Sequence, residues 1–332
     1  MREVAALAGV SRQTVSRVVN DHPSIRDSTR QRVLAAMEQL QFRPNRAARM
    51  LSTSRSNSIG ILASSASSLF GPASSIDAVE NAARDAGYFV TIAHIASPTP
   101  AEIESALDHL IAQAVEGIVI VAPQQRVHEA MSRVSITVPS VTMHGVRGPD
   151  GDGVYVDQVA GARLATRHLL ELGHHSIAHL SGPLDWAEAI ARRDGFVAEL
   201  AGTGVRGIVS EPGDWTTASG ARIAAELLAD RTVTGVFSSN DQMALGVLHA
   251  LRQNGRSAPQ DVSVIGFDDI PEAAFFGPPL TTVRQDFAEL GRRCVTRLLE
   301  AIDGAAGGGV ATGQQAISPE LVVRSSTGPA PD

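Results

Sequence analysis

The chain has 332 residues, of which 43% are hydrophobic, so it can bury a large core and should form two or three domains. It has no apolar run of membrane-spanning length and no secretory leader pattern, so we expect a cytoplasmic protein without a membrane partner. The net charge of −7 is uneven: residues 1–56 hold ten arginines against four acidic residues, whereas the remainder holds 18 arginines against 31 acidic residues. This asymmetry predicts a basic head that binds nucleic acid and an acidic body that does not.

Residues 2–19 have the pattern of two short helices joined at a tight turn. Gly9 permits the turn, Val10 is an apolar plug between the helices, and Ser11 can cap the second helix. The outward-facing side chains of that helix are Arg12, Gln13, Ser16 and Arg17. Because Arg and Gln match guanine and adenine edges in the major groove, we predict a DNA-recognition helix. The alternative is a solvated helix in a small bundle.

A third helix is expected over residues 28–40, where Val33, Leu34, Met37 and Leu40 make one apolar face that closes a three-helix head. Residues 44–51 can form a helix of only about two turns, which is marginal in isolation. A polar linker, residues 52–58, follows. We therefore expect a segment that couples the head to the body by folding only when it is held.

From residue 58 onward, short apolar runs alternate with helical patterns, as is typical of doubly wound parallel sheets. The expected strands are 59–63, 89–93, 117–121, 140–144, 176–180, 207–210, 235–239, 262–267 and 320–324. The expected helices are 76–87, 101–114, 125–134, 157–172, 187–201, 216–229, 241–254 and 287–302. The late helix and strand indicate that the chain recrosses between two lobes. A ligand should then bind in the cleft at the carboxyl ends of the strands.

The candidate ligand residues at these strand ends are His144, Arg192, Trp215, Asn240, Asp241, Asp268, Gln285 and Phe287. This mixture suits a polyhydroxylated ring, whose hydroxyls need donors and acceptors while its C–H face stacks on an indole. Two structural alternatives stay open. Asn240 and Asp241 could cap the following helix, and Asp268 with Asp269 could form a turn.

Residues 4–20 and 42–51 resemble the helix-turn-helix and hinge of the lac repressor family of bacterial regulators, and the likeness extends over essentially the whole chain. The resemblance implies a helix-turn-helix head and a two-lobed α/β core like that of periplasmic binding proteins. It also implies that the hinge leucine, Leu51, wedges into the minor groove of a near-palindromic operator. The implied DNA-binding residues are Arg12, Gln13, Ser16, Arg17, Asn20, Asn45, Arg46 and Leu51.

Residues 211–215, 239–246, 264–269 and 284–287 are similar to the effector-pocket motifs of the family's galactoside-binding member. The implied effector-binding residues are His144, Arg192, Trp215, Asn240, Asp268, Gln285 and Phe287. His144 stands where that member has an aspartate, and Val121 replaces a polar pocket residue. A sugar or glycoside is therefore expected, but a different one.

The expected domains are a head at 1–43, a hinge helix and linker at 44–57, and a core at 58–332. Within the core, lobe 1 should span about 58–155 and 287–315, and lobe 2 about 156–284 and 318–325.

An enzyme is not expected, because the chain has no G-x-G-x-x-G after a strand, no P-loop and no G-x-S-x-G elbow. No cofactor or metal is expected either. His174 and His175 could suggest a metal, but adjacent residues at a turn point apart and no ligand cluster accompanies them, which favours a structural role. Cys294 is expected to pack in a helix.

The sequence thus predicts a transcriptional repressor of sugar-catabolism genes that binds a palindromic operator as a homodimer and is released by a sugar. No apolar heptads follow Arg324, so no tetramerisation tail is expected. One alternative is a corepressor-type regulator that senses a non-sugar metabolite. The other is a sugar-binding protein without DNA function.

Overall fold

The computed structural model describes residues 1–19, 22, 24–42, 55–64, 69–143, 153–304 and 314–331. It separates into two compact units, residues 1–57 and residues 58–332. Across the described ranges, we find no helix with the length and apolar character needed to cross a membrane.

The first unit consists of three described helices, α1 (Arg2–Ala8), α2 (Arg12–Val19) and α3 (Asp27–Gln39). Gly9 ends α1 with a φ of 63°, a left-handed conformation that glycine adopts without a steric penalty. The Ser11 hydroxyl accepts a hydrogen bond of 3.1 Å from the Thr14 amide and so satisfies a free donor at the start of α2. The core of this unit is formed by Val4, Ala5, Ala8, Val15, Val18, Val33 and Ala36.

Two residues that were predicted to face the core of the head do not. Leu34 is 50% exposed and Leu40 is 39% exposed, whereas Ala36 is buried. Leu34 is one position from buried Val33, so it lies about 100° around the helix from the packed face. Leu40 is the C-cap residue of α3 and lies beyond the last packed turn. The predicted apolar face of residues 28–40 was therefore wrong at these two positions.

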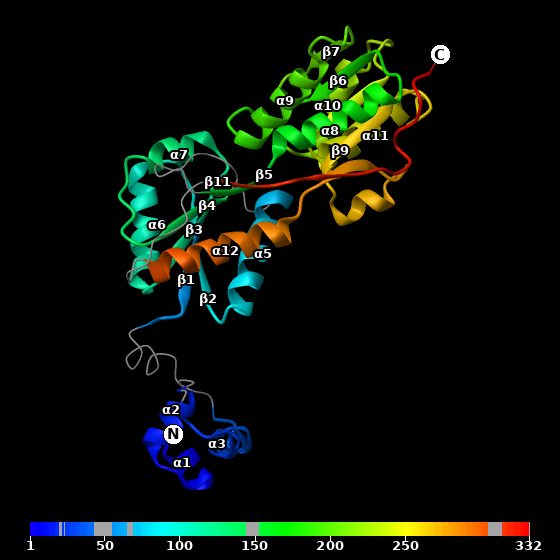
Figure 1. The fold of residues 1–332 in the computed structure, drawn as a ribbon. Coiled ribbons are helices and arrows are strands. Elements are labelled where there is room, and N and C mark those ends of the chain that lie inside the picture. The colour runs from blue at the N-terminus through cyan, green and yellow to red at the C-terminus, as the bar shows by residue number, and fades with distance from the viewer. Residues whose placement is uncertain are drawn as a thin grey trace. The chain divides into compact units, whose positions relative to one another are not determined.

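The second unit contains two six-stranded sheets, each covered by helices on both faces (Figure 1). We call each sheet with its helices a lobe. In lobe 1 all neighbouring strands are parallel, in the order β11-β5-β4-β3-β1-β2. Its strands are β1 (Ser58–Ser64), β2 (Phe89–Ile95), β3 (Gly117–Val121), β4 (Ser140–Met143), β5 (Gly153–Val156) and β11 (Gln314–Ile317). One face packs on α5 (Phe70–Asp85) and α12 (Phe287–Gly304), the other on α6 (Pro100–Ala112) and α7 (Gln125–Met131).

In lobe 2 the strand order is β12-β10-β9-β8-β6-β7, and only the edge pair β10–β12 is antiparallel among the described pairs. Its strands are β6 (Ser176–Leu180), β7 (Arg206–Val209), β8 (Gly235–Ser238), β9 (Ser263–Asp268), β10 (Thr281–Arg284) and β12 (Glu320–Val322). Its helices are α8 (Gln158–Glu171), α9 (Ala187–Leu200), α10 (Thr217–Leu227), α11 (Asp241–Gln253) and the 3₁₀ turn η1 (Pro271–Phe275).

The chain passes between the lobes three times, from β5 to α8, from β10 to α12 and from β11 to β12. The predicted fold class, a helical head with a two-lobed, doubly wound core, is confirmed. Three strands, β5, β10 and β11, were not predicted, because each has only four residues and β11 is half glutamine. Helix α5 begins at Phe70, six residues before its predicted start. The prediction missed these residues because the first turns of the helix are rich in Gly, Pro and Ser and lack apolar periodicity.

Candidate functional site

The first unit presents polar side chains from α2 on its surface. Arg12, Gln13 and Arg17 are exposed, and Ser16 is half-buried. The buried valines Val15 and Val18 fix the opposite face of α2 against the core of the head. The predicted DNA contacts Asn20, Asn45, Arg46 and Leu51, and with them the predicted hinge helix, lie outside the described residues.

The second unit contains a pocket lined by residues of both lobes. Six of the seven predicted effector residues line it: Arg192, Trp215, Asn240, Asp268, Gln285 and Phe287. The seventh, His144, lies outside the described residues. These residues come together because most of them follow strands of lobe 2, where the carboxyl ends of parallel strands share one sheet edge.

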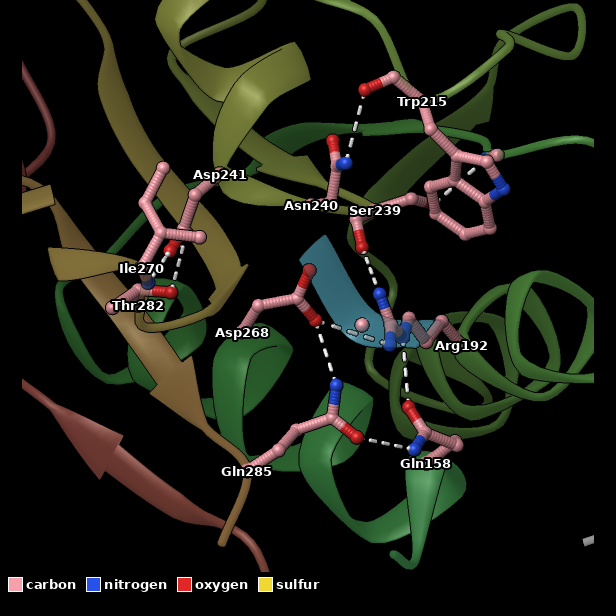
Figure 2. Close-up of polar contacts among 12 residues, drawn as sticks. Gln158, Arg192, Trp215, Ser239, Asn240, Asp241, Asp268, Ile270, Thr282 and Gln285 are labelled. Atoms are coloured by element: carbon pink, nitrogen blue, oxygen red, sulfur yellow. Dashed lines mark hydrogen bonds and ion pairs between the residues drawn. The ribbon is translucent and has the colours of Figure 1, made fainter. Parts of the chain in front are cut away.

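Four side chains of this region form a closed ring of hydrogen bonds (Figure 2). Arg192 donates through Nε to Gln158 Oε1 at 2.8 Å and through Nη2 to Asp268 Oδ1 at 3.4 Å. Gln285 Nε2 donates to the same Asp268 oxygen at 2.7 Å, and Gln158 Nε2 donates to Gln285 Oε1 at 2.7 Å. Arg192 also donates to the Ser239 carbonyl, so its position is determined by three protein acceptors.

The ring leaves one carboxylate oxygen of Asp268 for a ligand. Both side-chain contacts of this residue use Oδ1, as Figure 2 shows, so Oδ2 can still accept a hydrogen bond. Burial raises the pKa of Asp268 to about 6, against the opposing effects of the Arg192 charge and the Gln285 hydrogen bond. The carboxyl group is therefore predominantly ionised at neutral pH.

Three residues of this region have a strained backbone. Trp215, Asp268 and Asp269 have φ values of 72°, 109° and 54°, in a region that residues other than glycine seldom adopt. Such conformations persist where surrounding contacts overdetermine them, and they cluster at ligand-binding sites.

Asn240 both caps α11 and supports the pocket. Its Oδ1 accepts from the Met243 amide at 2.8 Å, which is the helix-capping alternative considered from the sequence. Its Nδ2 donates to the Trp215 carbonyl at 3.1 Å and to Gln242 Oε1 at 2.9 Å. These contacts use both donors of the amide and one of the two acceptor positions of Oδ1, so Asn240 holds the Trp215 backbone in its strained conformation and can still accept one hydrogen bond.

Trp215 provides a polar atom as well as a flat face. Its side chain lies 5.4 Å from Trp186, centroid to centroid, in an edge-to-face arrangement. Its Nε1 is buried and has no hydrogen-bond partner among the described residues. Buried indole N–H groups usually find an acceptor, so a ligand oxygen would complete this site.

Asp241, another candidate from the sequence, does not line the pocket. Its Oδ1 accepts from the Thr282 hydroxyl at 2.6 Å and its Oδ2 from the Ile270 amide at 2.8 Å (Figure 2). Burial, and next the charge of Asp268, raise the pKa of Asp241 well above its usual value. Asp241 therefore ties the start of α11 to Ile270 and to β10, so the structural alternative holds for this candidate.

Seven further residues of the two lobes line the pocket and were not predicted from the sequence. The additional lining residues are Leu69, Phe70, Gly71, Pro72, Pro123, Trp186 and Glu188. Phe70 packs edge-to-face on Phe287 at 5.9 Å, so the first residues of α5 and α12 form an apolar wall opposite the polar ring. Pro123 lies two residues after the expected strand 117–121, so the rule for strand ends could have identified it.

The described residues contain no group of three or more His, Cys, Asp or Glu side chains placed to hold a metal ion. His174 instead bonds the Thr234 hydroxyl at 2.9 Å and the Gly328 carbonyl at 3.2 Å, a structural role. Cys294 is buried in the core of lobe 1, where burial raises the pKa of its thiol.

Family models match two parts of the chain. Residues 1–45 match "Bacterial regulatory proteins, lacI family", and residues 166–327 match "Periplasmic binding protein-like domain".

Two relatives show how far the similarity extends. The lactose operon repressor of Escherichia coli (strain K12) is 34% identical over 327 residues, which cover 98% of this chain and 89% of that protein. The HTH-type transcriptional repressor PurR of Haemophilus influenzae (strain PittEE) is 32% identical over 333 residues, which cover 98% of each.

Solved structures of regulators are similar to this chain over the same length. The lac repressor dimer bound to operator and the anti-inducer ONPF has a TM-score of 0.82 at 34% identity, covering 98% of both chains. The complex of the transcriptional regulator CelR with cellobiose has a TM-score of 0.71 at 29% identity, again covering 98% of both chains.

Proposed function

Because this chain belongs to the lacI family of bacterial regulatory proteins, which are DNA-binding transcriptional repressors and not enzymes, we propose that it represses sugar-utilisation genes and releases its operator when a sugar binds. The family membership and the regulatory function predicted from the sequence are confirmed by the relatives at 34% and 32% identity. The effector, the direction of its effect and the contacts of individual residues are the parts that we propose.

The DNA-binding part of the proposal rests on α2. Arg12, Gln13 and Arg17 are exposed on one helix whose other face is packed into the head. Bidentate Arg–guanine and Gln–adenine pairs then read the major groove, while Ser16 and Asn20 contact the DNA beside them. Asn45, Arg46 and Leu51 follow by sequence similarity, with Leu51 inserted in the minor groove.

The target is a near-palindromic operator bound by a homodimer in the cytoplasm. Two-fold related heads need two half-sites of opposite orientation. The similarity over 98% of the chain to a lac repressor dimer bound to operator supports this assembly.

The pocket carries the proposal of a sugar effector. It places an acceptor, Asp268 Oδ2, and a donor, Trp215 Nε1, neither with a hydrogen-bond partner among the described residues, beside one cavity. A sugar hydroxyl can both donate and accept, and the C–H face of the ring stacks on the indole faces. A sugar complex is also known for a structural neighbour, the regulator CelR with cellobiose. We extend the assignment to His144, whose place after β4 matches the carboxyl end of a lobe 1 strand.

A thermal-shift screen of the full chain over mono- and disaccharides, with nucleobases and nucleosides as the alternative class, tests this proposal. A sugar should raise the melting temperature in proportion to the logarithm of its concentration. Asp268→Asn keeps the volume but replaces the ionised acceptor, and should weaken that sugar about tenfold or more. If only nucleobases shift the melting temperature, the effector is a non-sugar metabolite and the sugar assignment is wrong.

A further inference from the structure

A fully buried histidine of lobe 2 is not among the described residues that line the pocket. His179 lies on β6, and its ring packs against those of Phe196 and Phe237 at centroid distances of 5.3 and 4.7 Å. Burying an imidazole among aromatic side chains is costly unless its nitrogens form hydrogen bonds. Both nitrogens of His179 have a partner, so the question is what these two hydrogen bonds hold in place.

The hydrogen bonds of His179 have a fixed direction. Its Nδ1 lies 3.0 Å from the Phe237 carbonyl oxygen, which can only accept, so Nδ1 carries the proton. Burial lowers the pKa of His179 to about 3, so the ring is neutral at physiological pH and Nε2 can only accept. The Ser239 hydroxyl therefore donates to Nε2, at 3.3 Å, and its oxygen accepts from the Gly182 amide at 2.8 Å. We call these contacts of His179, Ser239 and Gly182 the β6–β8 relay.

Ser239 connects the β6–β8 relay to the polar ring of the pocket. Its carbonyl accepts a hydrogen bond from Arg192, as Figure 2 shows. Its amide donates to the Leu180 carbonyl at 2.9 Å. The hydroxyl is bonded to His179 on β6 and to Gly182 just after β6, so the relay determines the place of the carbonyl that holds Arg192.

Gly182 connects the β6–β8 relay to Trp215. A Cβ at Gly182 would lie 2.5 Å from Trp215 Cη2, so the indole lies directly against the Gly182 backbone. The same end of β6 also holds the segment that carries Trp215, because the Gly213 amide donates to the Ser181 carbonyl at 2.8 Å. A displacement of Gly182 therefore displaces the indole.

We propose that His179 is a positioning residue of the effector pocket: through Ser239 it sets the places of the Arg192 guanidinium and the Trp215 indole. A leucine would fill much of the same space without a polar atom to satisfy, so packing alone does not account for an imidazole here. The use of this arrangement for an effector rests on the proposed function. The relay and its hold on Trp215 do not.

A double-mutant cycle tests the relay. His179→Leu removes the acceptor, and Ser239→Ala removes the hydroxyl. If His179 acts through this hydroxyl, the double variant should change the pocket no more than Ser239→Ala does alone. His179→Gln keeps an acceptor for the hydroxyl and should restore most of the original behaviour. Phe196→Leu is the control, because Phe196 packs on His179 but is not part of the relay.

The indole N–H of Trp215 reports the pocket directly. The chain has two tryptophans, so the full chain with isotope-labelled tryptophan gives two indole signals by NMR, and Trp186→Phe identifies that of Trp215. His179→Leu should shift the Trp215 signal, whereas Phe196→Leu should lower the free energy of unfolding and leave this signal in place.

D-galactose, D-glucose and cellobiose serve as effector probes. For each sugar that binds the parent chain, His179→Leu should raise the dissociation constant about two- to tenfold, as expected for the net loss of one hydrogen bond. His179→Gln should raise it less, and Phe196→Leu should leave it unchanged.

A Trp215 signal that stays in place in His179→Leu, or shifts that add in the double variant, would overturn the positioning role. An equal shift in Phe196→Leu would also overturn it, because the effect would then come from packing of the core. None of these outcomes involves a sugar, so they leave the proposed effector class standing. If none of the three sugars binds, that counts against the proposed effector, and the Trp215 signal still decides the role of His179.

Discussion

Replacing Arg192 tests whether the hydrogen-bonded ring holds the pocket together. Arg192→Met keeps much of the side-chain volume but removes the three donations to Gln158, Ser239 and Asp268. It also leaves the Asp268 carboxylate without the charge that opposes the effect of burial on its pKa. Breaking one partner of a buried ion pair costs about 3–5 kcal/mol, so the free energy of unfolding of the core should fall by about that amount at pH 8.

The loss should depend on pH in a defined direction. The folded-state pKa of Asp268 is about 6, above the usual aspartate value, because of burial. Without Arg192 this pKa rises further. A group whose pKa is raised on folding contributes stability at low pH and loses it as the pH rises through the folded pKa. The variant should therefore be less destabilised at pH 5, where Asp268 is protonated, than at pH 8.

Urea unfolding of the full chain, followed by circular dichroism at both pH values, measures this effect. The neighbouring Arg193→Met is the matched control, because Arg193 is 33% exposed and pairs with Asp194, which is 56% exposed. Its loss should stay below about 1 kcal/mol at either pH. Equal losses for the two variants, or a loss at Arg192 that does not change between pH 5 and pH 8, would refute the reasoning.

Three further predictions follow from the described contacts. Gly246→Ala places a Cβ 2.3 Å from the Thr217 carbonyl oxygen, where α10 and α11 cross. This substitution should lower the free energy of unfolding, measured in urea, by about 1–3 kcal/mol. Gly71→Ala, whose Cβ would meet no atom within 4 Å, should lower it far less. Sugar affinity in titrations should fall as the pH drops below about 6, by up to about tenfold per unit, because protonation removes the charge of the Asp268 carboxylate and turns an acceptor oxygen into an O–H donor. A pH-independent affinity would contradict this. Arg17→Ala should cost about 1–3 kcal/mol of discrimination between operator and scrambled DNA in competition assays while sugar binding stays intact.

Much of the fold could be predicted because its central strands are uninterrupted apolar runs. β1 and β3 are buried on both faces, so residues 59–63 and 117–121 stand out from the amphipathic helices around them. The edge strand β11 carries no such signal. Residues 314–317 form a strand because β5 offers hydrogen-bonding partners, which the local sequence does not reveal.

The candidate site likewise contains residues that the sequence identifies and residues that it does not. Asp268 and Asn240 follow buried strands directly, so the strand-end rule identified them. Phe70 and Trp186 belong to the pocket because the two lobes approach each other, and a local pattern cannot report a contact between distant segments. Gln158 completes the ring from the first position of α8, where a glutamine has no distinguishing signature.

The central claim is that a DNA-reading head is controlled by a sugar in the pocket of the core. Selection from a random duplex library with the full chain, followed by fluorescence anisotropy at physiological salt, tests it most directly. We predict a near-palindromic sequence bound about a thousandfold more tightly than its scrambled version. A sugar that raises the melting temperature should then weaken that binding by about tenfold or more. No preference for any palindrome, or a preference that no bound sugar changes, would contradict the account.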